Sequence, residues 1–181
     1  ESRRRRVGRI QALFDVGQVP KTFVLTGGQH GKPGQPVEPG YLGVLCDSAE
    51  QAVMRPSRAA NGSSGRRLAL ARWLTAPDTR ASALVSRVLV NRAWQALFGR
   101  GLVATSGDFG VQGLPPSHPE LLEWLCRHFQ AHGWQLKPLL RVILNSHTYR
   151  QASRATRDRA TRGRDVDPSN RLLWRMPLRR L

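Results

Sequence analysis

The sequence has few of the residues that hold metals or haem through sulfur. Its 181 residues include two cysteines, Cys46 and Cys126, which lie far apart and belong to no C-x-x-C or C-x-x-C-H motif. This excludes a covalent haem site and a thiolate zinc site within the chain. The spacing leaves open whether the two thiols are free or joined in a disulfide. We therefore expect no cofactor held by this chain alone.

Long apolar runs, acidic residues and lysines are scarce as well. No run of about eighteen apolar residues occurs, so we expect no membrane span. The chain has 12 acidic and 29 basic residues, for a net charge of +17. Its only lysines are Lys21, Lys32 and Lys137. Such a basic chain suggests nucleic-acid binding. A genome rich in arginine codons explains the charge equally well. Because no spacing gathers the arginines on one face, we consider nucleic acid the weaker choice.

What is present suffices for a folded core. Hydrophobic residues make up 40% of the chain, and the length suits one domain with an appendage. The tryptophans stand singly in leucine-rich surroundings, so we interpret them as core anchors. They are Trp73, Trp94, Trp124, Trp134 and Trp174.

The composition changes along the chain and predicts three regions. Residues 1–54 form a basic leader and an extended Gly/Pro-rich segment, in which "KTFVLTGG" is typical of a short strand. Residues 55–67 read as a flexible linker. Residues 68–181 form a helical domain that we expect to be truncated at its C-terminal end. The chain shows no signal peptide and starts at Glu1, and we expect it to be a piece of a longer protein.

Helical periodicity sets in at Arg66 and gives the fold class. We expect helices over residues 66–74, 80–98, 118–132 and 137–147, a charged loop over 153–170, and the start of another element at Arg171. The prediction is a mainly α protein. It comprises an irregular helical domain of about four to five helices, preceded by a Gly/Pro-rich extended segment with one or two short strands.

The long helix carries polar residues at helical spacing. Arg87, Asn91 and Gln95 follow one another at intervals of four on a helix that is otherwise largely apolar. Such a narrow polar strip must meet a partner or a water-filled groove. Together with Arg92 and Arg100, these residues form our candidate binding groove.

The stretch "SGDFGVQGLPPSHPE" offers the main candidates for catalysis. Asp108, His118 and Glu120 could form an acid–base group. A structural explanation is simpler: Ser117 and Glu120 fit a capping box, and Asp108 fits a turn. "DFG" is also a kinase triplet, but the glycine-rich loop, strand lysine and H-R-D loop of kinases are absent.

Other reactive side chains lack the additional ligand or base that their chemistry requires. His128 and His132 have the spacing of a two-histidine metal pair, but no third ligand lies at helical spacing from them, so we expect no metal site. Cys126 has no base at a suggestive spacing, which argues against a thiol nucleophile.

Five blocks in order resemble one known family. They are "LFDVGQVPKTFVLTGGQHGKPGQPVEPGYLGVL", "LARWLTAPD", "VLVNRAWQALFGRGLVATSGDFGVQGLPPSHPELLEWL", "GWQLKPLLRVILNSHTYRQAS" and "DPSNRLLWRMPLRRL". The chain resembles the planctomycete PSD-one domain, a domain of unknown function (DUF1553). The resemblance implies a C-terminal module of an exported or periplasmic bacterial protein, usually one with a cytochrome c-type domain. Haem would then belong to an upstream domain only. No catalytic residues are implied.

From these observations we expect a non-catalytic structural or interaction module. Its partners would be other domains of the same polypeptide, together with a polysaccharide or a redox partner. Two alternatives stay open. One is a hydrolase-like or other enzyme site around Asp108 and His118, with Arg100 and Asn91 nearby. The other is nucleic-acid binding through the arginines.

Overall fold

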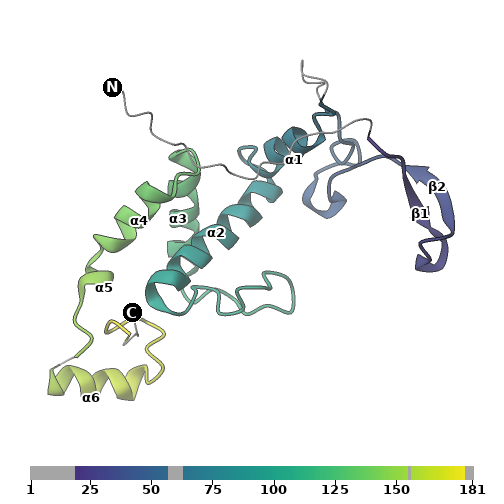
Figure 1. The fold of residues 1–181 in the computed structure, drawn as a ribbon. Coiled ribbons are helices and arrows are strands. Elements are labelled where there is room, and N and C mark those ends of the chain that lie inside the picture. Colours follow the sequence, from purple (N-terminus) through teal and green to yellow (C-terminus); the bar gives the residue numbers. More distant parts are fainter. Residues whose placement is uncertain (1–18, 57–62, 155, 178–181) are drawn as a thin grey trace, which may run out of the picture. The chain divides into compact units, whose positions relative to one another are not determined.

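The computed structural model describes residues 19–56, 63–154 and 156–177, and within them the chain is mainly α-helical, as predicted. The elements are β1 (Thr22–Leu25), the 3-10 turn η1 (Thr26–Gly28), β2 (Pro33–Val37), the 3-10 turn η2 (Gly43–Leu45), α1 (Arg66–Leu74), α2 (Arg80–Phe98), α3 (Pro119–Ala131), α4 (Leu136–Leu144), α5 (His147–Arg150) and α6 (Arg157–Val166) (Figure 1). The basic leader, the middle of the linker and residues 178–181 lie outside the described residues. The chain divides into two compact units, residues 1–72 and 73–181.

The first unit contains a β-hairpin. The strand predicted in "KTFVLTGG" is β1, which pairs antiparallel with β2, Thr22 facing Val37. The connection passes through Gly27 and Gly28, whose φ angles of 60° and 72° suit glycine. A Cβ on Gly34 would lie 2.9 Å from the Val24 carbonyl oxygen. Glycine therefore allows β2, which is poor in β-forming residues, to approach its partner.

The second unit is built around α2, whose bounds match the prediction. At its start the Thr79 hydroxyl accepts a hydrogen bond from the Ser82 amide. At its end Gly99 adopts a left-handed conformation with φ of 84°, and its amide donates to the Gln95 carbonyl. Both ends are therefore specified by local sequence.

The predicted capping box at the start of α3 does not form. The N-cap residue is His118 rather than Ser117, and no side chain caps the helix. The Ser117 amide donates to the Leu102 carbonyl at 2.8 Å, which holds this residue in the preceding loop. Its hydroxyl lies 3.0 Å from His118 Nδ1. The helix then begins with Pro119, whose missing N–H needs no cap.

The predicted helix over 137–147 is broken in two. α4 ends at Leu144 and α5 begins at His147, because the Ser146 hydroxyl accepts from the Tyr149 amide and caps a new helix. The same hydroxyl donates to the Ile143 carbonyl at 2.6 Å. A serine at a turn competes in this way with continuation of the helix.

The expectation of a charged loop over 153–170 is wrong, because most of it is α6. Within α6 only Ala160 and Gly163 are half-buried, and the other residues are exposed. A Cβ on Gly163 would lie 2.5 Å from the Trp174 ring. The helix thus packs through two small residues, which leave no hydrophobic stripe for periodicity to detect. The element expected from Arg171 is a set of turns instead.

The core of the second unit lies between α2, α3 and α4. Its buried residues are Val90, Trp94, Phe98, Leu102, Val103, Leu122, Leu125, Cys126, Phe129, Leu139 and Ile143. Trp94 is a core anchor at 5% exposure, but Trp124 is 51% exposed and is not one. No helix among the described residues combines the length and apolarity that a membrane crossing requires.

Candidate functional site

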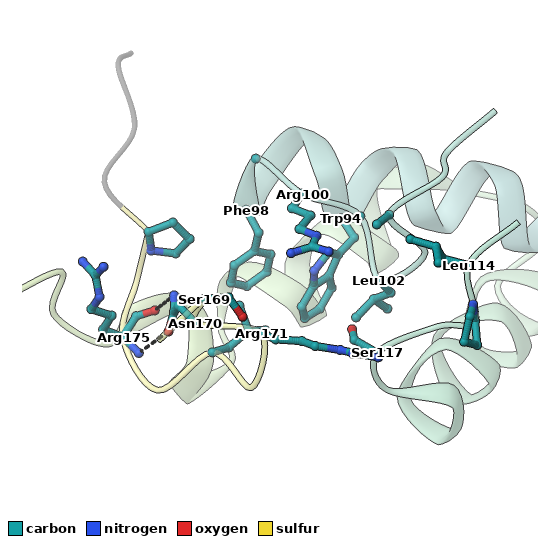
Figure 2. A pocket seen from close by; sticks show the side chains of 16 residues that line it. Trp94, Phe98, Arg100, Leu102, Leu114, Ser117, Ser169, Asn170, Arg171 and Arg175 are labelled. Atoms are coloured by element: carbon teal, nitrogen blue, oxygen red, sulfur yellow. Dashed lines mark hydrogen bonds between the residues drawn. The ribbon is translucent and has the colours of Figure 1, made fainter. Parts of the chain in front are cut away.

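A cavity of about 600 Å³ lies within the second unit, between the end of α2 and the chain's C-terminal segment (Figure 2). One wall consists of residues 94–117, which we call the loop wall. The other consists of residues 167–177, which we call the C-terminal wall. The cavity size is typical of ligand pockets. The two walls are held in place by different interactions.

The loop wall is held by Asn91, a residue of α2 that is fully buried. Its Nδ2 donates to the Val103 carbonyl at 3.0 Å, and its Oδ1 accepts from the Val103 amide at 2.9 Å. The side chain thus takes the place of a neighbouring strand and satisfies two backbone groups that are buried in the core.

Gly101 makes this arrangement possible. A Cβ at this position would lie 2.6 Å from Asn91 Nδ2 and 2.6 Å from the Val103 carbonyl oxygen. Both distances are shorter than real Cβ contacts. The glycine therefore leaves room for the Asn91 amide.

The C-terminal wall is organised around the buried carboxylate of Asp167. It accepts hydrogen bonds from the amides of Arg171 at 2.9 Å and Leu172 at 2.7 Å, and from the Ser169 hydroxyl at 3.2 Å. Burial acts to raise the pKa of Asp167. The two amide bonds, the Ser169 bond and the charge of Arg171 outweigh it, so this pKa is lowered overall.

Asn170 closes the same wall. Its Nδ2 donates to the Arg175 carbonyl at 2.9 Å and its Oδ1 accepts from the Arg175 amide at 3.2 Å, as the dashed lines in Figure 2 mark. Asn170 has a φ of 53°, a conformation that asparagine tolerates well. The wall joins the rest of the unit where Gln151 Nε2 donates to the Leu173 carbonyl at 2.6 Å.

Positive charge enters the cavity from both walls. Arg100 comes from the loop wall, and Arg171 and Arg175 come from the C-terminal wall. Figure 2 shows Arg171 extending along the cavity toward Ser117. No acidic residue lines the cavity, and within the described part of the chain none of the three arginines forms an ion pair. Arg175 Nε is buried without a hydrogen-bond partner there.

The three catalytic candidates face their own surroundings. Asp108 Oδ1 accepts from the Gly110 amide at 2.7 Å, as an aspartate does in a turn. His118 Nδ1 lies by the Ser117 hydroxyl, and Glu120 is exposed on the first turn of α3. No interaction joins these three side chains to one another among the described residues. A catalytic role for them stays a prediction.

The candidate groove on α2 is divided among different surroundings. Asn91 is buried, Arg92 is exposed, and Gln95 is half-buried. Arg100 lines the cavity described above. Arg87 lines a separate cavity of about 430 Å³ beneath Phe109 and Gly110.

Arg87 already has a charged partner. Its Nη2 lies 3.0 Å from Glu123 Oε2, and Arg127 pairs with the same carboxylate at 3.1 Å. The hydrogen bond from Arg87 is the main cause that lowers the pKa of Glu123. The Arg87 side chain is therefore less available to a ligand than that of Arg100.

The two thiols and the paired histidines of α3 and its C-cap are poorly placed for chemistry. Cys46 and Cys126 are both free, and burial raises the pKa of Cys126 to about 11. The rings of His128 and His132 lie 4.0 Å apart, but His132 Nδ1 contacts the His128 carbonyl oxygen at 2.8 Å. No cluster of three metal-ligating side chains occurs in residues 19–56, 63–154 and 156–177.

A second hollow of about 720 Å³ runs between α3 and α4, and we call it the apolar groove. Its lining includes Leu121, Trp124, Pro138 and Val142. Trp124 is half exposed, and the ring of His128 stacks on it at 5.3 Å. An exposed tryptophan in an apolar hollow marks a surface suited to a partner.

The sequence missed the C-terminal wall. Asp167, Asn170 and Arg171 all lie in the block "DPSNRLLWRM", which the sequence assigns to a charged loop, to the start of another element and to a family block, but not to a site. The signal was available: Asp, Pro, Ser and Asn in succession favour a turn held by side-chain hydrogen bonds. A turn of this kind, placed among arginines, indicates a preformed cationic surface.

A comparison with protein families supports four of the five sequence blocks, because the first block lies before the matched region. Residues 66–181 match the PSD1 family, described as "Protein of unknown function (DUF1553)". The matched region includes both cavity walls and the apolar groove. No curated protein and no solved structure matches the chain.

Proposed function

The chain belongs to the PSD1 family of proteins of unknown function, and we propose that it acts by binding rather than by catalysis. It serves as an interaction module of an exported, multidomain, cytochrome-associated protein. Its main partner is another domain of the same polypeptide. A polysaccharide or a redox protein would be engaged by the whole assembly.

The apolar groove is the observation that carries this proposal. Trp124 is 51% exposed there, whereas the other large ring of the same groove, Trp94, is 5% exposed. Leaving an aromatic surface of this kind in water is unfavourable by about 25 cal/mol for each Å². A neighbouring domain that covers Trp124 would remove that surface from solvent.

The local structure of the catalytic candidates supports binding over catalysis. The Asp108 carboxylate serves its own loop, and Asn91 serves the backbone of Val103. Cys126 is buried with a raised pKa and is a poor nucleophile. A general acid or base has to lie within hydrogen-bond distance of a bound substrate, whereas these side chains bind the protein's own backbone or are buried.

Hydroxyl-radical footprinting of the complete polypeptide tests the proposal. In the 181-residue chain alone, Trp124 should be oxidised about tenfold faster than Trp94, the ratio of their exposed fractions of 51% and 5%. In the complete polypeptide the two rates should become similar. An unchanged tenfold difference would contradict docking at the groove.

Matched variants show whether the protection comes from the groove. Leu121→Lys places a charge inside the groove and should restore fast oxidation of Trp124 in the complete polypeptide. Leu84→Lys changes an exposed leucine of α2 outside the groove and should leave the protection intact. A haem stain and an absorbance scan of the same protein test the cytochrome context, and absence of haem would remove that part.

A further inference from the structure

We infer that the cavity between the loop wall and the C-terminal wall is a binding site for an organic oxyanion. The ligand class is a carboxylate, sulfate or phosphate group carried on a small apolar body. This site is separate from the apolar groove, with which it shares only Trp94 among its lining residues. It therefore stands whether or not a domain docks on the groove.

The charge of the cavity specifies an anion. Arg100, Arg171 and Arg175 line it, and no acidic residue does. Elsewhere in the unit the exposed arginines Arg87 and Arg127 share the carboxylate of Glu123. The cavity arginines form no ion pair in the described residues, although the charge of Arg171 also acts on the Asp167 carboxylate. Arg100 has no carboxylate partner there, and its charge is therefore the most available to a ligand. Arginine forks match the planar oxygens of carboxylate, sulfate and phosphate groups.

Arg175 adds a second indication. Its Nε is buried and makes no hydrogen bond within the described residues, and its guanidinium carbon lies 5.2 Å from the centre of the Trp174 ring. A buried donor without a partner is uncommon in native proteins. Figure 2 shows this side chain directed away from Phe98 and Arg100, so Arg175 adds positive charge at the edge of the cavity rather than a ligand contact inside it.

The remaining lining specifies an apolar body rather than a sugar. Phe98, Leu102, Leu114 and Leu173 face the cavity. The neutral polar groups are already engaged: Ser169 binds Asp167, Asn170 binds the backbone of Arg175, and Ser117 contacts His118. Few groups remain to recognise hydroxyls. Trp94 and Phe98 are almost fully buried and stack on each other at 4.2 Å, so they form a wall and not a platform for a ring.

Both walls are fixed without a ligand. Asn91 holds the backbone on one side, and Asp167 and Asn170 hold it on the other. The arginine stems therefore project from an ordered backbone, which lowers the entropy that binding must overcome. A volume of about 600 Å³ exceeds what a bare inorganic ion needs.

Calorimetric titration of the 181-residue chain at low salt provides the test. The probes are phenyl phosphate, benzenesulfonate and benzoate, with inorganic phosphate and benzyl alcohol as matched halves of the ligand. We expect the aromatic anions to bind at least about tenfold more tightly than either half, since both charge and apolar contact contribute. The order among the three anions identifies which oxyanion the site prefers.

Three variants test the location. Arg100→Gln and Arg171→Gln should each weaken phenyl phosphate binding by about tenfold, because each removes a charge-assisted hydrogen bond. Arg92→Gln removes an exposed arginine of α2 that does not line the cavity and should change binding less than about twofold. All three substitutions are at exposed positions, and a thermal melt confirms that each variant is folded.

Several outcomes would overturn the inference. Equal losses in all three variants would mean that the net charge of +17 alone attracts the anion. Benzyl alcohol binding as tightly as phenyl phosphate would remove the role of charge. Inorganic phosphate binding as tightly would remove the apolar body. No heat with any anion would remove the site, while leaving the footprint of Trp124 unaffected.

Discussion

The two walls of the cavity solve the same problem in different ways. Each consists largely of irregular backbone, whose N–H and C=O groups must be paired although no helix or strand pairs them. The loop wall relies on Asn91, which reaches it from the buried face of α2. The C-terminal wall relies on Asp167 and Asn170, which belong to the wall itself.

This difference determines whether a wall unfolds only with the whole unit or can unfold locally. The loop wall cannot unfold without disrupting the core, because Asn91 lies on the same buried face of α2 as Val90 and Trp94. A wall held by its own side chains can fail alone. Substitutions in the two walls should therefore differ in size and in how far their effects spread.

Asn91→Ala should have the largest effect. It leaves the N–H and C=O of Val103 buried and unpaired, and we expect it to reduce the free energy of unfolding by about 3 kcal/mol. Chemical denaturation followed by circular dichroism measures this. Gln95→Ala, on the next turn of the same helix, is the control and should cost less than about 0.5 kcal/mol. Equal losses in the two variants would show that the Asn91 bonds carry no special weight.

Asp167→Ala should have an intermediate effect confined to the C-terminal wall. It removes the acceptor for the Arg171 and Leu172 amides and should cost about 2 kcal/mol. Hydrogen exchange should increase in residues 167–177 and not in α2. Asp165→Ala removes the same charge from an exposed position of α6 and serves as control. Faster exchange in α2 as well would show that this wall is not independent.

Acid should erase the contribution of Asp167. Its pKa is lower in the folded chain than the ordinary value of 3.8, so the carboxylate stabilises the fold fully above 3.8. That contribution is lost as the pH falls below 3.8 through the folded pKa. The stability difference between the wild type and Asp167→Asn should therefore shrink from pH 6 to pH 2.5. A constant difference over this range would mean that the charge is not what the amides bind.

Asp108→Ala should have the smallest effect. Its one bond, to the Gly110 amide, is exposed. The Thr105 hydroxyl holds the same loop independently, since it donates to the Asp108 carbonyl and accepts from the Leu114 amide. We expect a loss of about 0.5 kcal/mol in a thermal melt. Asp108→Asn retains an acceptor oxygen and should be neutral. A loss as large as that of Asn91→Ala would contradict this ranking.

The sequence predicted those parts of the fold that local signals encode. α1 and α2 have the expected bounds because their ends coincide with glycine, threonine and proline signals. α2 also has a buried face at helical spacing. β1 followed from its β-branched and aromatic residues. The mainly α class and the short strands follow directly from these elements.

Longer-range contacts account for what the sequence did not reveal. Ser117 could not cap α3 because its amide is bound by Leu102, fifteen positions earlier in the chain. α6 had no apolar stripe because Gly163 lies against the ring of Trp174 and the only other half-buried residue of the helix is Ala160. Of the residues in the candidate groove, Arg100 lines the cavity. Arg171 is 71 positions away in the chain, and the sequence gives no sign that the fold brings it to the same cavity.

The bond between Asn91 and Val103 has a consequence for the order in which the molecule opens. The Val103 amide donates its hydrogen bond to the side chain of Asn91, which is itself 0% exposed. Exchange of this amide with solvent requires its bond to Asn91 to open, and Asn91 is packed on the buried face of α2. The loop wall and the core therefore behave as one cooperative unit, and the cavity keeps this side until the unit unfolds as a whole.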